Sequence, residues 1–125
     1  MPIDINDISY KIIGCAYKVH SALGPGLLES TYETCLCHEM TKAGLDFERQ
    51  LELPILYDDI KLESGYRIDL LVENRIIIEN KSVDSIEGIH KAQIITYLKL
   101  SKMKLGLLIN FNVLDLKKGI NRFVN

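Results

Sequence analysis

The sequence predicts an α/β fold in which helices flank a mixed central β-sheet. Hydrophobic residues recur every three or four positions through the first third of the chain, which is typical of amphipathic helices. From about residue 47 they alternate with polar residues, as in strands. The last third places a helical pattern between two apolar strand segments. Such a strand-helix-strand connection normally joins parallel strands, so we expect a mixed sheet.

Length and charge narrow the class of protein further. The chain has 125 residues and no linker-like segment, which predicts one domain over residues 1–125. Fifteen Lys and Arg against 17 Asp and Glu give a net charge of −2, which excludes binding to a polyanion by overall charge alone. We find no apolar segment of about 20 residues and no secretory signal pattern. These features predict no membrane segment and a cytoplasmic location.

Two helices are expected at the start. A cap at Asn6 or Asp7 precedes apolar residues at helical spacing over 8–23, and the Gly-Pro-Gly sequence at 24–26 ends this helix. A second helix is expected over 27–44, where a glycine closes it. The three cysteines, Cys15, Cys35 and Cys37, lack the spacing of a disulfide framework or zinc site and are expected to be free.

Three strands then follow. The first runs over 47–57, and Pro54 indicates that it lies at a sheet edge or contains a break; a turn-rich stretch follows it. The second covers about 66–72, turns at residues 73–74 and returns as the third over 75–81. The strong apolar character of this last segment places it inside the sheet.

The chain closes with a helix, a strand and a shorter segment. The helix is expected over 85–100, the buried strand over 104–113, and a short terminal strand over the last seven residues. The predicted order is therefore α-α-β-β-β-α-β with a further final β.

Three charged residues interrupt the apolar hairpin strands: Asp69 in the first, and Glu79 and Lys81 near the end of the second. Alternation places Glu79 and Lys81 on one face, and pairing through the turn brings Asp69 within reach of Glu79. Two adjacent carboxylates repel each other, and a divalent ion such as Mg²⁺ relieves the repulsion. A lysine there can hold or deprotonate a water, so the pattern indicates phosphodiester hydrolysis.

An ordinary solvated strand pair is the alternative, and these three residues alone favour it, since Glu and Lys often alternate on exposed strands. The neighbours decide otherwise. Asp69 lies among Ile68, Leu70 and Leu71, and Glu79 follows three isoleucines, where an unpaired charge is costly.

The D…E-x-K pattern on adjacent strands resembles that of the PD-(D/E)XK, or restriction-endonuclease-like, nuclease superfamily. The segment GLLESTY at 26–32 resembles the motif of the GxxExxY proteins, a prokaryotic family in that superfamily, and the resemblance extends from about Ile8 to Asn125. It implies a restriction-endonuclease-like fold and a nuclease that uses Mg²⁺ or Mn²⁺, acting on DNA more than on RNA.

The resemblance also implies residue roles. Asp69 and Glu79 correspond to metal ligands, together with the main-chain carbonyl of Asn80, and Lys81 to the catalytic lysine. Glu29 corresponds to the catalytic acidic residue on the helix before the sheet. The alternative for Glu29 is an ordinary favourable charge at a helix N-terminus. Asn80 stands where relatives have an apolar residue, which indicates either an added polar contact or a weakened site.

Supporting and binding residues are expected on the last helix and after it. Gln93 and Tyr97 share the Q-x-x-x-Y spacing of some nuclease branches, although a tyrosine there also suits the core. Phosphate contacts are expected from four lysines, whose alternative is ordinary solvation: Lys91, Lys99, Lys102 and Lys104.

Other functions remain open on the sequence alone. A catalytically silent module that binds protein or nucleic acid would keep the same fold, and an enzyme acting on a nucleotide or another phosphate ester would keep the same ligands. Cleavage of both strands of a duplex would need two sites, which suggests a homodimer.

Overall fold

The computed structural model describes residues 3–62 and 66–125. Its helical segments are α1 (Ile5–Leu23), α2 (Glu29–Lys42), α3 (Gly88–Ser101) and the short 3-10 helix η1 (Leu116–Gly119). Its strands are β1 (Phe47–Glu52), β2 (Ile55–Tyr57), β3 (Ile60–Leu62), β4 (Arg67–Val72), β5 (Ile76–Lys81), β6 (Leu105–Asn110) and β7 (Ile120–Val124).

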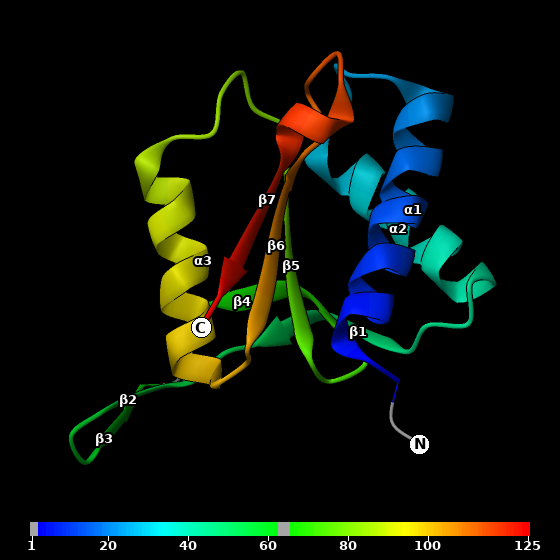
Figure 1. Cartoon of the computed structure of the whole chain (residues 1–125). Helices are drawn as coiled ribbons and strands as arrows, with labels where there is room; N and C mark the ends of the chain where they lie inside the picture. The colour runs from blue at the N-terminus through cyan, green and yellow to red at the C-terminus, as the bar shows by residue number, and fades with distance from the viewer. Residues whose placement is uncertain (1–2, 63–65) are drawn as a thin grey trace.

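A mixed sheet forms the middle layer of the protein (Figure 1). Within the described residues it has five strands in the order β1-β4-β5-β6-β7, and only β5 and β6 run parallel. Helices α1 and α2 cover one face, where they pack on apolar residues such as Leu70, Ile78 and Leu107. Helix α3 covers the other face and packs on residues such as Ile77 and Leu108. The predicted α/β class with a mixed, helix-flanked sheet is confirmed.

The first two helices lie where periodicity places them, with one correction. Asp4, rather than Asn6 or Asp7, caps α1, and its side chain accepts a hydrogen bond of 2.7 Å from the Asn6 amide. Asp4 is the cap because its backbone is extended while helical geometry already begins at Ile5. The chain leaves α1 through Gly24 and Gly26, whose φ angles of 71° and 99° suit glycine.

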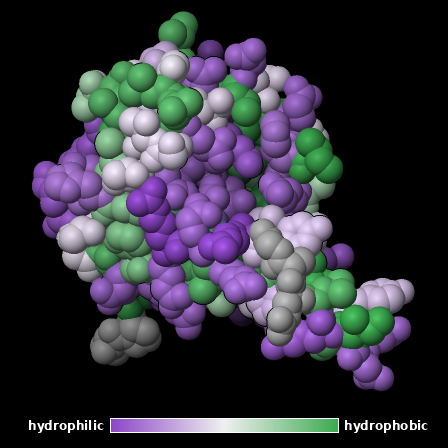
Figure 2. All heavy atoms as spheres, turned by 180° about the vertical axis from the view of Figure 1, so that it is seen from behind, coloured by the Kyte–Doolittle hydropathy of each residue, from purple (hydrophilic) through white to green (hydrophobic). Residues whose placement is uncertain are grey.

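The segment around Pro54 differs from the single strand predicted over 47–57. Strand β1 ends at Glu52 and lies at the sheet edge, so Pro54 marks both a break and an edge. The stretch predicted to be only turn-rich contains β3, which pairs with β2 in a separate hairpin, and its last residues lie outside the described ones. Figure 2 shows this hairpin at the lower right, with hydrophobic as well as hydrophilic residues on its surface. Leu56 and Ile60 are among its exposed hydrophobic residues.

The hairpin of β4 and β5 has the predicted register. Its turn residues Glu73 and Asn74 have φ angles of 52° and 53°, the left-handed geometry of a two-residue hairpin turn. Leu70 pairs with Ile78, so one further step places Asp69 opposite Glu79. Strand β5 is buried and lies in the middle of the sheet, as its apolar sequence predicts.

Helix α3 starts at Gly88, three residues later than predicted. The amide of Glu87 donates to Nδ1 of His90 at 2.9 Å, and this reciprocal cap fixes the helix start. The predicted terminal strand is present as β7, which pairs antiparallel with β6.

Two further features of the described residues concern the cysteines and the apolar character of the helices. Cys15, Cys35 and Cys37 are free. Across residues 3–62 and 66–125, no helix combines the length and the apolar character needed to cross a bilayer.

Among the glycines that the structure describes, Gly119 in η1 is expected to be the least tolerant of a side chain. A Cβ built there lies 2.2 Å from the carbonyl oxygen of Asn110, which is backbone and cannot turn away. We predict that Gly119→Ala lowers the free energy of unfolding by about 1–3 kcal/mol. Urea denaturation measures this. The control is Gly88→Ala, where a Cβ meets nothing within 4 Å, and equal midpoints for both variants would contradict the prediction.

Candidate active site

Strands β4 and β5 separate at Asp69 and Glu79, where side chains replace the hydrogen bonds of the ladder. Backbone pairing extends as far as Leu70 and Ile78. Beyond it, the amide of Asp69 donates to Oε2 of Glu79 at 2.8 Å, and the amide of Asn80 donates to Oδ2 of Asp69 at 2.9 Å. Each carboxylate thus holds the backbone of the opposite strand, and we call Asp69, Glu79 and Asn80 the fork.

Both carboxyl groups of the fork resist ionisation. Burial raises the pKa of Asp69 to about 6, and the hydrogen bond from the Asn80 amide opposes this shift. Burial, followed by the charge of Asp69, raises the pKa of Glu79 to about 8. Since Glu79 is only 4% exposed, the second negative charge is the costly one. The fork is therefore a place where a cation would be favourable.

The side chain of Lys81 lies on the same face of β5 as that of Glu79, and its charge favours the ionised form of both carboxyl groups of the fork. It is half-buried at the end of the strand, and its charge lowers the pKa of Asp69 and of Glu79. Asn80 points to the other face by alternation and is fully buried. Both polar atoms of its side chain lack a hydrogen-bond partner among the described residues. The buried side-chain amide of Asn80 therefore has a desolvation cost that no described contact offsets.

Helix α2 contributes a second acidic group that the sequence interpretation missed. Glu33 is 6% exposed and accepts hydrogen bonds from Arg49 Nε at 2.7 Å and from Gln50 Nε2 at 3.0 Å. Gln50 also reaches Oδ1 of Asp69 at 3.4 Å, so it links Glu33 to the fork. Glu33 lies four residues after Glu29, which puts both on one helix face and is the signal that points to it.

The predicted Glu29 lies beside this network rather than in it. It begins α2, is exposed, and its charge raises the pKa of both fork carboxyl groups. A cavity of about 350 Å³ opens here, next to the fork. Its lining residues are Leu28, Glu29, Ser30, Glu33, Gln50 and Asp69.

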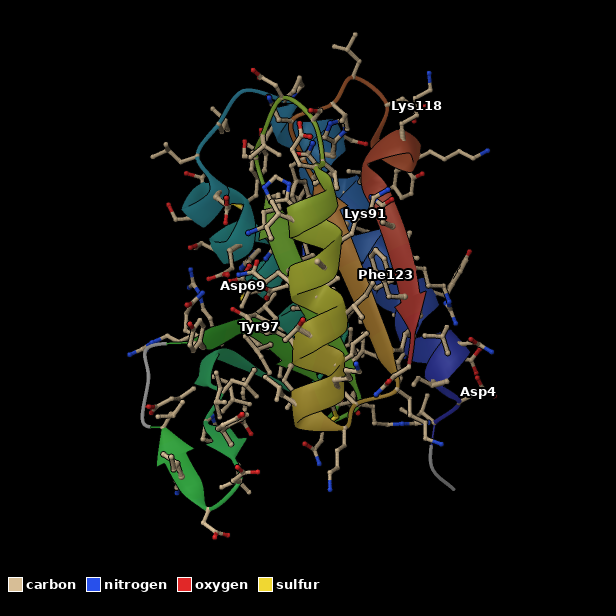
Figure 3. All side chains as sticks on the ribbon, turned by 90° about the vertical axis from the view of Figure 1, so that its left-hand side faces the viewer. Asp4, Asp69, Lys91, Tyr97, Lys118 and Phe123 are labelled. Atoms are coloured by element: carbon tan, nitrogen blue, oxygen red, sulfur yellow. The ribbon has the colours of Figure 1, made fainter. Side chains whose placement is uncertain are left out.

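Helix α3 borders the fork from the other side (Figure 3). Tyr97 is 7% exposed, and burial and then the charge of Glu79 raise its pKa. Gln93 Nε2 donates to the Tyr97 hydroxyl at 3.2 Å. The structure thus brings Gln93 and Tyr97 together and places Tyr97 close to Glu79, while Gln93 itself is exposed.

The four predicted phosphate-binding lysines do not form one group. All are exposed, but Lys91 lies in the first turn of α3 and Lys99 near its end (Figure 3 labels Lys91). Lys102 and Lys104 lie beyond α3, at the end of the sheet where β5 begins. That end is opposite the fork, so these two lysines do not border it.

The fork suits a hard divalent ion in its donor chemistry. Each carboxylate accepts from the backbone through one oxygen, and the second oxygen of Asp69 accepts only a long hydrogen bond of 3.4 Å from Gln50. Both second oxygens and the Asn80 carbonyl are oxygen donors of the kind that hard divalent ions prefer. Among the described residues, no three or more His, Cys, Asp or Glu side chains group as a metal cage. A two-carboxylate site fits Mg²⁺, which usually keeps several waters and binds through one or two carboxylates.

The GLLESTY segment places the start of α2 next to the end of β5. The Tyr32 hydroxyl donates to the Gly24 carbonyl at 2.6 Å and accepts from the Leu27 amide at 3.1 Å. Its ring stacks on Phe111 with centroids 4.7 Å apart. Ser82 Oγ in turn donates to the Leu27 carbonyl at 2.6 Å. The tyrosine therefore fixes the loop that leads to Glu29 at the start of α2, next to the fork.

Removing the Tyr32 hydroxyl is expected to loosen this loop. Tyr32→Phe keeps the stacked ring but leaves the Leu27 amide and Gly24 carbonyl without their partner. We predict a loss of about 1–2 kcal/mol in the free energy of unfolding, measured by urea denaturation. The control Tyr10→Phe removes a hydroxyl from an 81%-exposed side chain and should change nothing measurable. A Tyr32→Phe variant as stable as the parent would contradict this role.

Comparison with known proteins agrees with the geometry. The family model of the PD-(D/E)XK nuclease superfamily matches residues 6–123, nearly the whole chain. Searches of curated proteins and of solved structures gave no match. The match spans every helix and strand around the fork from α1 to β7, apart from their outermost residues. The chain belongs to the PD-(D/E)XK nuclease superfamily.

Proposed function

We propose that this chain is a metal-dependent nuclease that hydrolyses phosphodiester bonds at the fork, in DNA more than in RNA. The observation that supports it is the pair of hydrogen bonds by which Asp69 and Glu79 hold the separated strands. Burial raises the pKa of both carboxyl groups, and the nearby charge of Lys81 partly opposes this rise. Membership of the GxxExxY family, supported by GLLESTY, is part of this proposal.

The residues divide the work by their chemistry. Asp69, Glu79 and the Asn80 carbonyl would hold Mg²⁺ or Mn²⁺, which when bound polarises a phosphoryl oxygen and stabilises the departing one. Lys81 Nζ holds the attacking water and takes part in its deprotonation. Cleavage then yields a phosphomonoester and a free hydroxyl group.

Three further residues frame the reaction. Glu29 lines the adjoining cavity and orients water from the α2 side. Tyr97, held by Gln93, borders Glu79 from α3. These two sides leave the fork accessible through the cavity in which Asp69 lies.

The test is cleavage of plasmid, single-stranded DNA and RNA with Mg²⁺ or Mn²⁺. Lys81→Ala is expected to slow cleavage by about 10²–10⁴-fold, because the lysine holds and helps to deprotonate the attacking water. Calorimetry should still detect ion binding, because Lys81 is not a ligand of the ion. Lys61→Ala, on the projecting hairpin, is the control and should cut like the parent. A parent that binds either ion and cuts none of the substrates would refute the nuclease proposal.

A silent binding module is the second candidate, and the β2–β3 hairpin favours it. This two-stranded arm exposes Leu56 (68%), Tyr57 (68%) and Ile60 (57%), and isolated hairpins are marginally stable in water. A protein partner or a second copy of the chain would cover them. We also propose a cytoplasmic homodimer, which light scattering tests: a monomer at working concentration excludes the dimer.

A further inference from the structure

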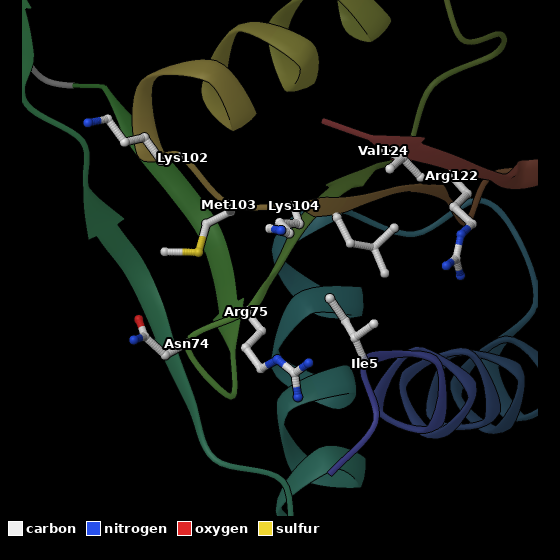
Figure 4. A pocket seen from close by; sticks show the side chains of 9 residues that line it. Ile5, Asn74, Arg75, Lys102, Met103, Lys104, Arg122 and Val124 are labelled. Carbon is white, nitrogen blue, oxygen red and sulfur yellow. The ribbon is translucent and has the colours of Figure 1, made fainter. Parts of the chain in front are cut away.

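A second, larger cavity of about 560 Å³ lies at the end of the sheet opposite the fork. It is bounded by the start of α1, the β4–β5 turn, the end of α3 and the outer ends of β6 and β7 (Figure 4). Its floor is apolar, with Ile5, Leu105 and Val124 among the lining residues. Four cationic side chains come to it from three parts of the chain, two of them from the connection between α3 and β6: Arg75, Lys102, Lys104 and Arg122.

No carboxylate balances these four charges within the described lining of the cavity. The lining contains neither Asp nor Glu, and the ion pairs found in residues 3–62 and 66–125 involve only Lys42 and Arg49 as cations. Arg122 is held by neutral groups, with hydrogen bonds of 3.2 Å to Ser9 Oγ and 2.8 Å to Asn6 Oδ1. Arg75 donates to the main-chain carbonyl of Ile3. Their charges are therefore fixed in place without being neutralised.

The arrangement of these cations is extended. Figure 4 shows Lys102 at one side of the cavity, Lys104 and Arg75 near its middle, and Arg122 at the other side. Lys102 is itself the residue that ends α3, and its backbone has the left-handed conformation, with φ 60°. A single small anion needs cations that converge on one point, whereas a chain of phosphates needs them spread along a line.

We propose that this cavity binds the phosphodiester backbone of a nucleic acid strand. The choice of nucleic acid among polyanions rests on the proposed nuclease function. A net charge of −2 for the whole chain makes the local excess of four cations a site rather than a general property of the surface. Contacts of this kind position a strand without reading its sequence.

The distance between the cavity and the fork determines the role that phosphate contacts at the cavity have in substrate binding. Five residue steps of β5, roughly 17 Å, separate Ile76 beside the cavity from Lys81 beside the fork. That length corresponds to about five nucleotide steps along one strand of a duplex. The cavity thus anchors the substrate several nucleotides from the bond that is cut, and it contributes to affinity rather than to chemistry.

The test is binding of short labelled single-stranded and duplex DNA by fluorescence anisotropy, in EDTA, over a series of KCl concentrations. The Lys102→Gln, Lys104→Gln double variant removes two cavity cations that form no ion pair among the described residues. We expect weaker binding and a slope of log Kd against log salt reduced by about 2, one for each lost phosphate contact. The matched control is Lys11→Gln, Lys18→Gln on α1, which should keep the parent slope.

The outcomes separate this inference from the proposed activity. If the cavity variant binds with the parent's Kd and slope, or if the control loses as much, the inference is wrong even when the parent cuts DNA. If the parent binds inorganic phosphate at the cavity but no DNA, the site takes a small anion and the inference is also wrong. A parent that binds through the cavity yet cuts nothing refutes only the nuclease activity.

Discussion

Asp69→Asn is expected to abolish divalent-ion binding and to lower phosphodiester cleavage by at least about 10³-fold. An ion at such a site supplies several kcal/mol of transition-state stabilisation, and each 1.36 kcal/mol is a factor of ten in rate. Asparagine keeps a side-chain oxygen that can accept from the Asn80 amide at the fork. The substitution therefore removes the charge and leaves the backbone contact.

Calorimetry with Mn²⁺ and a plasmid assay measure the two effects of Asp69→Asn. The matched control is Asp58→Asn at the tip of the β2–β3 hairpin, an exposed aspartate far along the chain from the fork. It should bind the ion and cut like the parent. An Asp69→Asn protein that keeps its fold, binds Mn²⁺ and cuts at the parent's rate would show that the fork is not the active site.

Glu79→Gln is expected to stabilise the metal-free fold at alkaline pH by about 1–3 kcal/mol. The folded-state pKa of Glu79 is raised to about 8, above the ordinary value of 4.5 that applies when the chain unfolds. The folded state therefore holds a proton that the unfolded state has lost. Stability falls as the pH rises from about 4.5 to about 8, and glutamine removes this loss.

Urea denaturation in EDTA at several pH values measures this effect. The parent should lose stability through that window, and Glu79→Gln should lose less. Mg²⁺ should restore the parent at high pH, by about 2.7 kcal/mol at 100 times its dissociation constant, and should leave Glu79→Gln unchanged. The control Glu48→Gln, on an exposed residue of β1, should follow the parent. Identical pH profiles for parent and Glu79→Gln would show that Glu79 is not a buried acid.

Much of the fold follows from local patterns. Helical spacing gives α1 and α2, and the apolar run before Glu79 gives the central strand β5. The register of Asp69 and Glu79 also follows, because both lie equally far from the hairpin turn. The β2–β3 hairpin and the Asp4 cap did not follow, because three-residue strands and a single cap residue are too short to show a period.

The surroundings of the candidate site depended on tertiary contacts. Glu33 and Gln50 are 17 positions apart in the chain, and only the packing of α2 on the sheet edge brings their side chains within 3.0 Å. The separation of Lys104 from the fork depends on the direction of α3, which carries the chain back to the start of β5. Lysines that look like one group in the sequence thus lie at different ends of the sheet.

The sequence by itself determined the α/β class, the superfamily and the pairing of Asp69 with Glu79, since each depends on periodicity or on motifs within short segments. The tertiary structure decided that β4 and β5 separate at the two carboxylates. From the sequence we expected strand pairing to continue there, whereas in the structure hydrogen bonds from the side chains replace those between the backbones. The tertiary structure also decided that four cations surround a cavity at the far end, because charges from separate elements meet only when the chain folds.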